Sequence, residues 1–317
     1  MKKYRPLLLL ILWALALQLN AQQLASWTQF RAFQYATNPA VVDVFDLEED
    51  NLIDLDLVYR KQWTSFEGAP ETAFLGLQYV NDRANMSLAG LVLNDEFGPT
   101  SYAQAQLQYA YQIKMDAYGD NFLSIGLAFA ANQFRVNADK LKVENPNDQL
   151  IGDAPQNKTL MNGSFGLYYQ GAIGASRFNR KYLIAGFSAE QMLPADLEIE
   201  GQAGQLANLK RALHFHAFLG TRIYYGSDYD YVEPVLWAKA VRGAPMNYFF
   251  ATRMTFSEQR FWLGAGISSD WEGHLQAGVG LSEQIHLGYA TSFYLANTLG
   301  ADIGLTHEIR LAFRGMF

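Results

Sequence analysis

The stretch SYAQAQLQYAYQI, residues 101–113, decides the fold class because it alternates between two kinds of side chain. Apolar residues fill the odd positions from Ala103 to Ile113, and glutamine fills four even positions, at 104, 106, 108 and 112. Successive side chains of a strand point to opposite faces, so the pattern predicts a strand with one apolar and one hydrophilic face. This strand is longer than the roughly 5–6 residues usual in soluble sheets. Its length and its wet face favour a membrane barrel.

The same alternation recurs along the chain and predicts an all-β protein, a transmembrane antiparallel β-barrel of about 14 strands. A β-rich soluble protein is the alternative fold class. No apolar run after residue 21 is long enough for a membrane helix. The expected strands are 52–60, 71–80, 85–94, 100–113, 121–135, 163–173, 181–191, 209–224, 230–240, 246–257, 259–269, 272–282, 284–295 and 302–314.

The connections between these strands sort by length. If the first strand starts in the periplasm, the two longest connections, 136–162 and 192–208, are extracellular, and the turns expected in the periplasm are short. A soluble sandwich gives no reason for such sorting. Aromatic residues near strand ends are expected to form girdles at the membrane interfaces: Tyr109, Tyr111, Tyr224, Tyr225, Trp262 and Tyr289.

The two ends of the chain favour export. Residues 1–21 have the charged start, apolar run and small-residue exit of a secretory signal peptide. We expect residues 22–51 to form a periplasmic or plug segment and 52–317 to form the barrel. The chain has no cysteine, which excludes disulfides and a lipid-anchored thiol, and its formal charge of −7 argues against nucleic acid as a partner. The last strand alternates up to Phe317, which is similar to the signal read by barrel-assembly machinery.

Four segments form an ordered set of motifs. They are Gln29-Phe30 with Phe33-Gln34-Tyr35 and Asn38-Pro39-Ala40; Tyr59-Arg60-Lys61-Gln62-Trp63 through Phe66-Glu67-Gly68-Ala69-Pro70; Asn94-Asp95 with Gly98-Pro99; and Thr306-His307-Glu308-Ile309. In this order they resemble the PorP/SprF family of type IX secretion membrane proteins of Bacteroidota. The chain departs from the family at Ala36-Thr37 and at Val41-Val42-Asp43, next to the Asn-Pro-Ala motif.

The resemblance implies an outer-membrane barrel that works with the type IX secretion and gliding machinery. It implies that the protein binds or anchors a secreted surface protein, such as an adhesin, through the C-terminal domain of that protein. The implied partners are this secreted protein, components of the secretion machinery and outer-membrane lipid. We expect no cofactor and no enzymatic activity.

The second motif, residues 59–70, is the main candidate site. It is expected in the first extracellular loop, with Arg60 and Lys61 at the rim facing lipid headgroups or acidic partner residues. Trp63 and Phe66 offer rigid aromatic area, and the Gly-Ala-Pro sequence can fold the loop inward. Two interpretations stay open: the motif binds a partner, or it plugs the mouth of the barrel.

Other candidate sites give weaker signals. His214 and His216 share a strand face and could bind a metal, although a hydrogen-bonded pair facing the lumen is the simpler interpretation. The acidic run 43–50 reads as a solvated segment, with calcium binding as the alternative. We find no catalytic Ser/His/Asp grouping.

Transport of hydrophobic small molecules is the alternative function. Barrels of the long-chain fatty-acid channel family, which transport hydrophobic small molecules, also have a plug with an Asn-Pro-Ala element, which residues 38–40 match. A general diffusion porin is disfavoured, because the expected inner faces read as Gln, Ser, Gly and His rather than as a charged ring.

Overall fold

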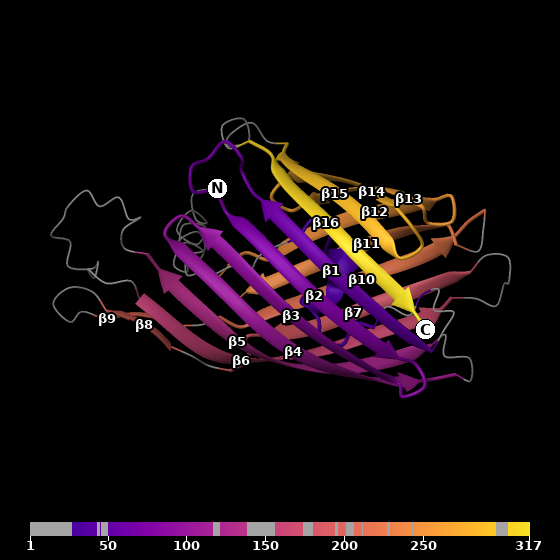
Figure 1. The fold of residues 1–317 in the computed structure, drawn as a ribbon, viewed down its shortest axis with the longest axis horizontal. Coiled ribbons are helices and arrows are strands. Elements are labelled where there is room, and N and C mark those ends of the chain that lie inside the picture. The colour runs from indigo at the N-terminus through magenta and orange to yellow at the C-terminus, as the bar shows by residue number, and fades with distance from the viewer. Residues whose placement is uncertain are drawn as a thin grey trace, which may run out of the picture.

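The fold is a closed barrel of fourteen antiparallel strands, seen in a computed structural model (Figure 1). Backbone is described for residues 27–42, 45, 50–116, 121–137, 156–173, 180–193, 196–200, 206–210, 212–226, 229–241, 244–295 and 304–317. The expected fold class is confirmed, with the strands close to their predicted positions. The expected signal peptide lies outside the described residues.

The barrel strands follow one another around the wall in chain order, and β1 pairs with β16 to close it. They are β1 (Asn51–Lys61), β2 (Glu71–Asn81), β3 (Met86–Phe97), β4 (Thr100–Lys114), β5 (Phe122–Val136), β6 (Gln156–Ala172), β7 (Lys181–Glu190), β10 (His214–Tyr224), β11 (Tyr231–Val241), β12 (Asn247–Phe256), β13 (Phe261–Ser268), β14 (Glu272–Gly280), β15 (Ile285–Tyr294) and β16 (Thr306–Met316). A separate hairpin is formed by β8 (Asp196–Glu200) and β9 (Leu206–Lys210).

The alternation read from residues 101–113 holds in β4. Leu107 exposes 73% of its surface to the outside, whereas its neighbour Gln106 exposes 6% and faces the lumen. The wall therefore turns its apolar residues toward lipid and its polar residues inward, as an outer-membrane barrel requires.

The two ends of the barrel differ in their connections. At one end, which we call the turn end, short connections lie at 82–85, 115–121, 173–180, 225–230, 257–260 and 281–284. The opposite end, the loop end, carries the β8–β9 hairpin and the long connections 137–155 and 191–213 (Figure 1). Periplasmic turns thus lie at the turn end and extracellular loops at the loop end. Three connections are exceptions, since 98–99, 242–246 and 269–271 are short yet lie at the loop end.

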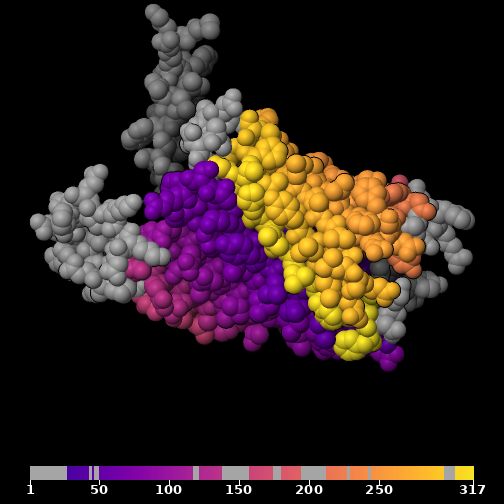
Figure 2. All heavy atoms as spheres, turned by 45° about the horizontal axis from the view of Figure 1, so that its top comes forward, coloured from indigo at the N-terminus to yellow at the C-terminus, as the bar shows by residue number. Residues whose placement is uncertain are grey.

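The β1–β16 seam is complete. The two strands pair from Leu52↔Met316 to Lys61↔His307, and Asn51 and Phe317 exchange backbone hydrogen bonds of 3.1 Å in both directions. Figure 2 shows the indigo and yellow strands side by side on the surface. A closed seam leaves no unpaired edge in the hydrocarbon region. In the described residues no helix has the length and apolar character to cross a membrane.

Three expectations about the strands were wrong. β6 begins at Gln156 rather than at 163, because its first residues are polar and give no apolar alternation. The region 192–208, expected to be a plain loop, contains β8 and part of β9, and β10 therefore begins only at His214. Among the expected girdle residues, Tyr109, Tyr111 and Tyr289 point outward, whereas Tyr224 and Trp262 are buried and face the interior.

Candidate functional site

The N-terminal segment fills the middle of the barrel. We call residues 27–42 together with Phe45 the plug; its one helix is the short 3-10 helix η1 (Phe30–Ala36). Most plug side chains are buried, and polar contacts tie the plug to β1, β2, β4, β6, β7, β11, β15 and β16. Contacts on all sides indicate that the lumen at this level is occupied by protein.

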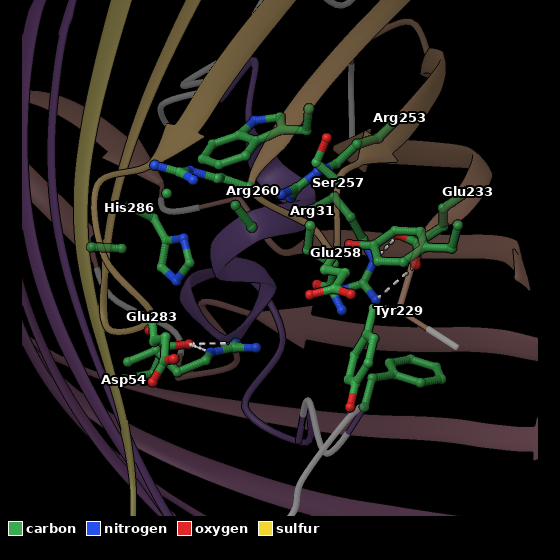
Figure 3. A pocket seen from close by; sticks show the side chains of 18 of the residues that line it. Arg31, Asp54, Tyr229, Glu233, Arg253, Ser257, Glu258, Arg260, Glu283 and His286 are labelled. Carbon is green, nitrogen blue, oxygen red and sulfur yellow. Dashed lines mark hydrogen bonds and ion pairs between the residues drawn. The ribbon is translucent and has the colours of Figure 1, made fainter. Parts of the chain in front are cut away.

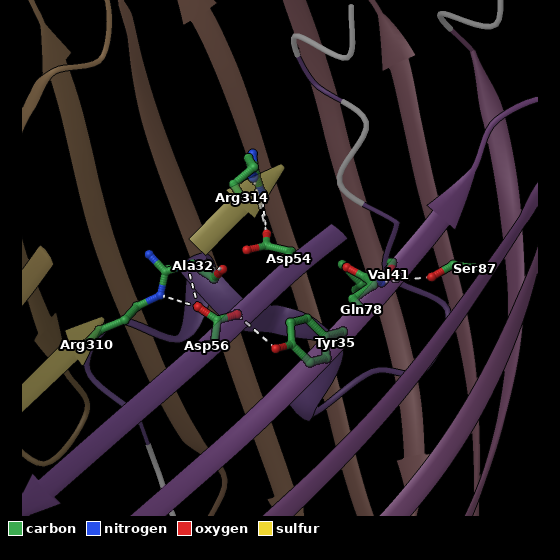
Figure 4. Close-up of polar contacts among 9 residues, drawn as sticks. All are labelled: Ala32, Tyr35, Val41, Asp54, Asp56, Gln78, Ser87, Arg310 and Arg314. Carbon is green, nitrogen blue, oxygen red and sulfur yellow. Dashed lines mark hydrogen bonds and ion pairs between the residues drawn. The ribbon is translucent and has the colours of Figure 1, made fainter. Parts of the chain in front are cut away.

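The centre of the plug is held by a buried charged group on the wall. The Tyr35 hydroxyl donates to Asp56 at 2.8 Å, and Arg310 donates to the same carboxylate at 2.7 Å (Figure 4). Burial and the nearby Asp56 charge raise the pKa of Tyr35 well above its ordinary value, so the hydroxyl keeps its proton. Arg310 also reaches the carbonyl of Ala32 at 3.4 Å, which joins wall and plug a second time.

The Asn-Pro-Ala motif seats the plug on β5 and β6. The Asn38 amide donates to the Leu167 carbonyl at 3.0 Å, while its side-chain oxygen accepts from the Ala40 amide at 3.0 Å. The wall makes room with glycine: a Cβ added to Gly166 would overlap the Asn38 oxygen, and one added to Gly126 would overlap the Pro39–Ala40 backbone. The motif therefore acts inside the barrel.

A ladder of glutamines connects the plug with the loop end along β4. The Tyr102 hydroxyl donates to Gln104 at 2.6 Å, Gln104 donates to Gln106 at 2.8 Å, and Gln106 donates to Gln108 at 3.1 Å. Gln108 then donates to the Tyr35 carbonyl at 3.2 Å. Three inward glutamines of the opening sequence, at 104, 106 and 108, thus bond to one another and to the plug backbone rather than lining open water.

The start of the plug is fixed near the loop end by Glu308. Its two carboxylate oxygens accept from the backbone amides of Thr28 and Gln29 at 2.8 and 2.9 Å. Arg60, on the neighbouring strand, lies with its Nε 3.7 Å from the same carboxylate. Arg60 is 3% exposed and Glu308 is fully buried. Arg60 therefore points into the lumen and not toward lipid headgroups at the rim, contrary to our expectation.

The rest of the second motif forms the loop between β1 and β2. Its ends are closed by a hydrogen bond from the Gln62 amide to the Pro70 carbonyl at 2.9 Å. When the Gln62 side-chain oxygen faces inward, it accepts from both terminal nitrogens of Arg60, at 2.6 and 2.9 Å. Lys61 stays outside, where it pairs with Glu71 at 2.6 Å. The motif thus has one cation inside the barrel and one at its outer surface.

Two neighbouring connections brace this loop. The Thr64 amide donates to the Leu305 carbonyl, just before β16, at 3.0 Å, and the Gly98 amide donates to the Gly68 carbonyl at 3.0 Å. Gly68 adopts a φ of 75°, which favours glycine. Phe66, at the tip, remains 52% exposed, and Trp63 is half-buried. The loop therefore presents an aromatic side chain on a fixed backbone.

The third motif lies beside the second. Asp95 on β3 accepts from the Thr72 hydroxyl at 2.6 Å, and Asn94 donates to Glu96 at 3.2 Å on the outside. Gly98 and Pro99 form the short connection to β4, and the Pro99 carbonyl accepts from the amide of Asn137 at 2.8 Å. The motif holds the loop end of β2–β5 together.

The closing strand brings the fourth motif to the same place. His307 faces outward, where its ring nitrogen lies 2.6 Å from the Tyr289 hydroxyl, while Glu308 faces the plug. Three of the four family motifs thus meet at one point through Gln29, Arg60 and Glu308. Sequence reasoning placed these residues in motifs but gave no sign that they contact one another.

His214 and His216 both face the lumen, as expected. His214 bonds to the Ala212 carbonyl at 2.9 Å, and His216 stacks on Trp237 with ring centroids 5.5 Å apart. Neither ring nitrogen of His216 makes a hydrogen bond in the described residues, so the expected hydrogen-bonded pair was wrong in that part. Within the described residues no cluster of His, Cys, Asp or Glu could hold a metal ion. Of the acidic run 43–50, only Phe45 and Asp50 lie in the described part of the chain.

The lumen is more charged than the sequence reading suggested. Below the plug, a cavity of about 810 Å³ opens among the turns of the turn end (Figure 3). Glu233 on β11 accepts from Arg31 of the plug at 2.5 Å and from Arg222 of β10 at 2.6 Å. Asp54 pairs with Arg314 at 2.7 Å. The expectation of inner faces made of Gln, Ser, Gly and His was therefore wrong on this side of the barrel.

Comparison of the sequence with known protein families agrees with the motifs described above. A sequence model described as type IX secretion system membrane protein PorP/SprF matches residues 19–313. The chain belongs to the PorP/SprF family. As a member with a closed transmembrane barrel, it is an outer-membrane protein associated with type IX secretion. Among curated proteins, none matches this PorP/SprF chain.

Several solved barrels are similar to this PorP/SprF protein in outline. A deletion mutant of the TodX monoaromatic hydrocarbon channel has a TM-score of 0.47 at 10% identity, covering 88% of this chain and 92% of that one. The translocator domain of the autotransporter NalP from Neisseria meningitidis has 0.46 at 12%, covering 90% and 96%. The toluene transporter TodX from Pseudomonas putida has 0.41 at 10%, covering 95% and 96%.

Proposed function

We propose that this PorP/SprF barrel holds a secreted protein, of the adhesin kind, at the cell surface by binding its C-terminal domain at the loop end. Family membership supports a role in type IX secretion. The observation that carries the proposal is the occupied lumen: the plug is tied to strands all around the wall. A barrel filled in this way favours docking at its ends over passage through its middle.

The loop between β1 and β2 is the part of the loop end best suited to bind a partner. Its backbone is fixed by bonds to Leu305 and Gly98, and Phe66 projects from it. Rigid aromatic side chains give binding area at a low entropic cost, and such residues dominate binding energies at protein interfaces. The two interpretations of the motif therefore combine: Arg60 supports the plug, and Phe66 faces a partner.

Each segment of the chain has a role in this proposal. We infer that residues 1–21 are removed on export, that 22–51 form the plug segment and that 52–317 form the barrel. Components of the secretion machinery would contact the turn end, and lipid would contact the outward apolar residues. We infer a role in gliding from membership of the same family.

Deletion of the protein tests this function against small-molecule uptake. If the barrel anchors a surface protein, the deletion strain releases one large secreted protein into the medium, and the tagged barrel co-purifies with that protein from detergent-solubilised outer membranes. Mass spectrometry identifies the partner. Unchanged surface proteins together with lost uptake of an apolar nutrient would instead support a channel for hydrophobic molecules.

A further inference from the structure

The cavity at the turn end has the features of a ligand-binding site. Its floor is made by the plug residues Arg31 and Ala32 and by the wall, and its mouth lies between the turns 257–260 and 281–284. Its volume of about 810 Å³ falls in the range of sites that enclose small molecules, roughly 300–1,000 Å³. The mouth faces the periplasm, so a ligand would enter from that side.

Among the described residues, the floor has more guanidinium groups than carboxylates. The floor carboxylates are Asp54 and Glu233, with Asp56 beside them on β1, and each already pairs with arginine. The turns at the mouth add Glu258, Glu283 and Arg260 to the lining. The arginines are Arg31, Arg222, Arg253, Arg310 and Arg314. An excess of positive charge in a partly enclosed space, where solvent screening is weak, attracts anions.

Arg253 is the floor arginine that this excess of positive charge leaves without a carboxylate partner among the described residues. It stands opposite Glu233 in the β11–β12 register, but the oxygens of Glu233 bind Arg31 and Arg222. In the described part of the chain Arg253 has no ion pair; its guanidinium lies 4.7 Å from the ring centroid of Trp262, and its buried Nε has no hydrogen-bond partner. The buried Nε is closed to a ligand, but a ring on one face leaves the two terminal nitrogens, which carry the other four donors of the guanidinium, open to one.

The neighbouring Arg222 differs from Arg253, because its guanidinium contacts both aromatic rings and a carboxylate. Its guanidinium lies 3.8 Å from the Phe45 ring centroid and 3.9 Å from that of Tyr231, and it donates to Glu233 at 2.6 Å. Arg222 thus has a carboxylate as well as aromatic rings, whereas Arg253 has only the ring.

We propose that this cavity binds a small anion that carries carboxylate or phosphate groups, with Arg253 as its main ligand. Guanidinium groups bind both oxyanions through paired, charge-assisted hydrogen bonds. Arg31, which belongs to the plug, lines the same space. A bound anion therefore bridges wall and plug and stabilises the plugged barrel by linkage. This site is independent of partner binding at the loop end.

Isothermal titration calorimetry of the purified full-length protein in detergent tests the site. Sodium pyrophosphate and trisodium citrate serve as separate probes, each against sodium chloride at equal ionic strength. At least one probe should bind saturably at one site, and Arg253→Gln should weaken that binding about tenfold or more. Arg83→Gln is the matched control, because Arg83 is an exposed arginine of another turn and does not line the cavity.

A second variant tests the same site in case Arg253→Gln folds poorly. Glu283 lies exposed in the turn at the mouth, so Glu283→Lys should leave the barrel intact and raise the affinity of the bound probe about twofold. Absence of saturable binding of both probes, or equal binding by wild type and folded Arg253→Gln, overturns the proposal. Binding of a hexaglutamate peptide without binding of either small anion would also overturn it, in favour of a peptide site.

Discussion

Arg60 and Glu308 stand opposite each other on β1 and β16, and their side chains meet inside the barrel with Arg60 Nε 3.7 Å from the Glu308 carboxylate. Glu308 also receives the first two amides of the plug, from Thr28 and Gln29. The pair therefore joins the barrel seam, the signature loop and the N-terminal segment. Its position gives a structural reason for the likeness of this chain to its family in three separate motifs.

Breaking this pair should destabilise the protein strongly. Glu308→Gln removes the carboxylate that pairs with the buried Arg60 across the seam and weakens the acceptor for the plug amides. Removing one member of a buried ion pair costs about 3–5 kcal/mol. Urea unfolding in detergent, followed by heat-dependent gel mobility, measures the loss.

Lys61→Gln is the control for Glu308→Gln, because Lys61 pairs with Glu71 at the exposed surface. Its stability should stay close to that of the wild type. The double variant Arg60→Gln with Glu308→Gln should lose less than the sum of the single losses. Additive losses would mean that the two side chains do not interact.

Gly166→Ala should unseat the plug, because the added methyl group overlaps the Asn38 side chain. Overpacking of this kind costs about 1–3 kcal/mol. The natural chain has no cysteine, so Val42→Cys introduces a single buried thiol in the plug. Maleimide labelling of this thiol should be faster when Gly166→Ala is present.

The control for plug seating is Gly90→Ala, in which the new methyl group lies 3.4 Å from the flexible Leu107 side chain and 3.9 Å from the Gln106 carbonyl oxygen, both ordinary contacts. Labelling of Val42→Cys should be unchanged in this background. Equal labelling rates in the Gly166→Ala and Gly90→Ala backgrounds would argue against a seat formed by Asn38 and Gly166.

Phe66→Ala combined with Trp63→Ala should weaken retention of the surface partner without unfolding the barrel, because both residues belong to the β1–β2 connection and not to a strand of the wall. Retention is measured as the share of the partner found on cells rather than in the medium. Trp271→Ala is the matched control, since Trp271 is another exposed aromatic residue of the loop end, 63% exposed, on a different turn. Normal retention by the double variant at normal abundance would refute a binding role for this loop.

Leu107→Arg should reduce the free energy of folding into lipid vesicles by about 2–4 kcal/mol, as expected for a cation on the lipid face near the bilayer centre. Leu107 is the most exposed of the large apolar residues of β4. Ser65→Arg, in the exposed loop, should have little effect. Urea titration of folded and unfolded fractions measures both. Equal folding energies for the two variants would mean that Leu107 does not face lipid.

The strands could be predicted from the sequence because lipid and lumen impose opposite demands on neighbouring residues. Gln106 and Leu107 show this clearly, with one inside and the other against lipid. The same rule did not find β8 and β9, because each has only five residues, or the start of β6, because its first residues are polar and give no apolar alternation.

The inward position of Arg60 could have been found from the same alternation. Asp54, Asp56, Val58 and Arg60 share one face of β1, and Leu57 and Tyr59 share the other. We read Arg60 as part of a loop motif, and this concealed its strand position. The contact of Arg31 with Glu233 had no local signal, because it joins residues far apart in the chain and depends on how the plug sits.

The central claim is that the plug closes the barrel, and ion conductance in planar bilayers tests it most directly. The full-length protein should show no steady channel steps, whereas a variant lacking residues 27–42 should insert and conduct. Steady conductance of the full-length protein at the level of the plugless variant would contradict the account.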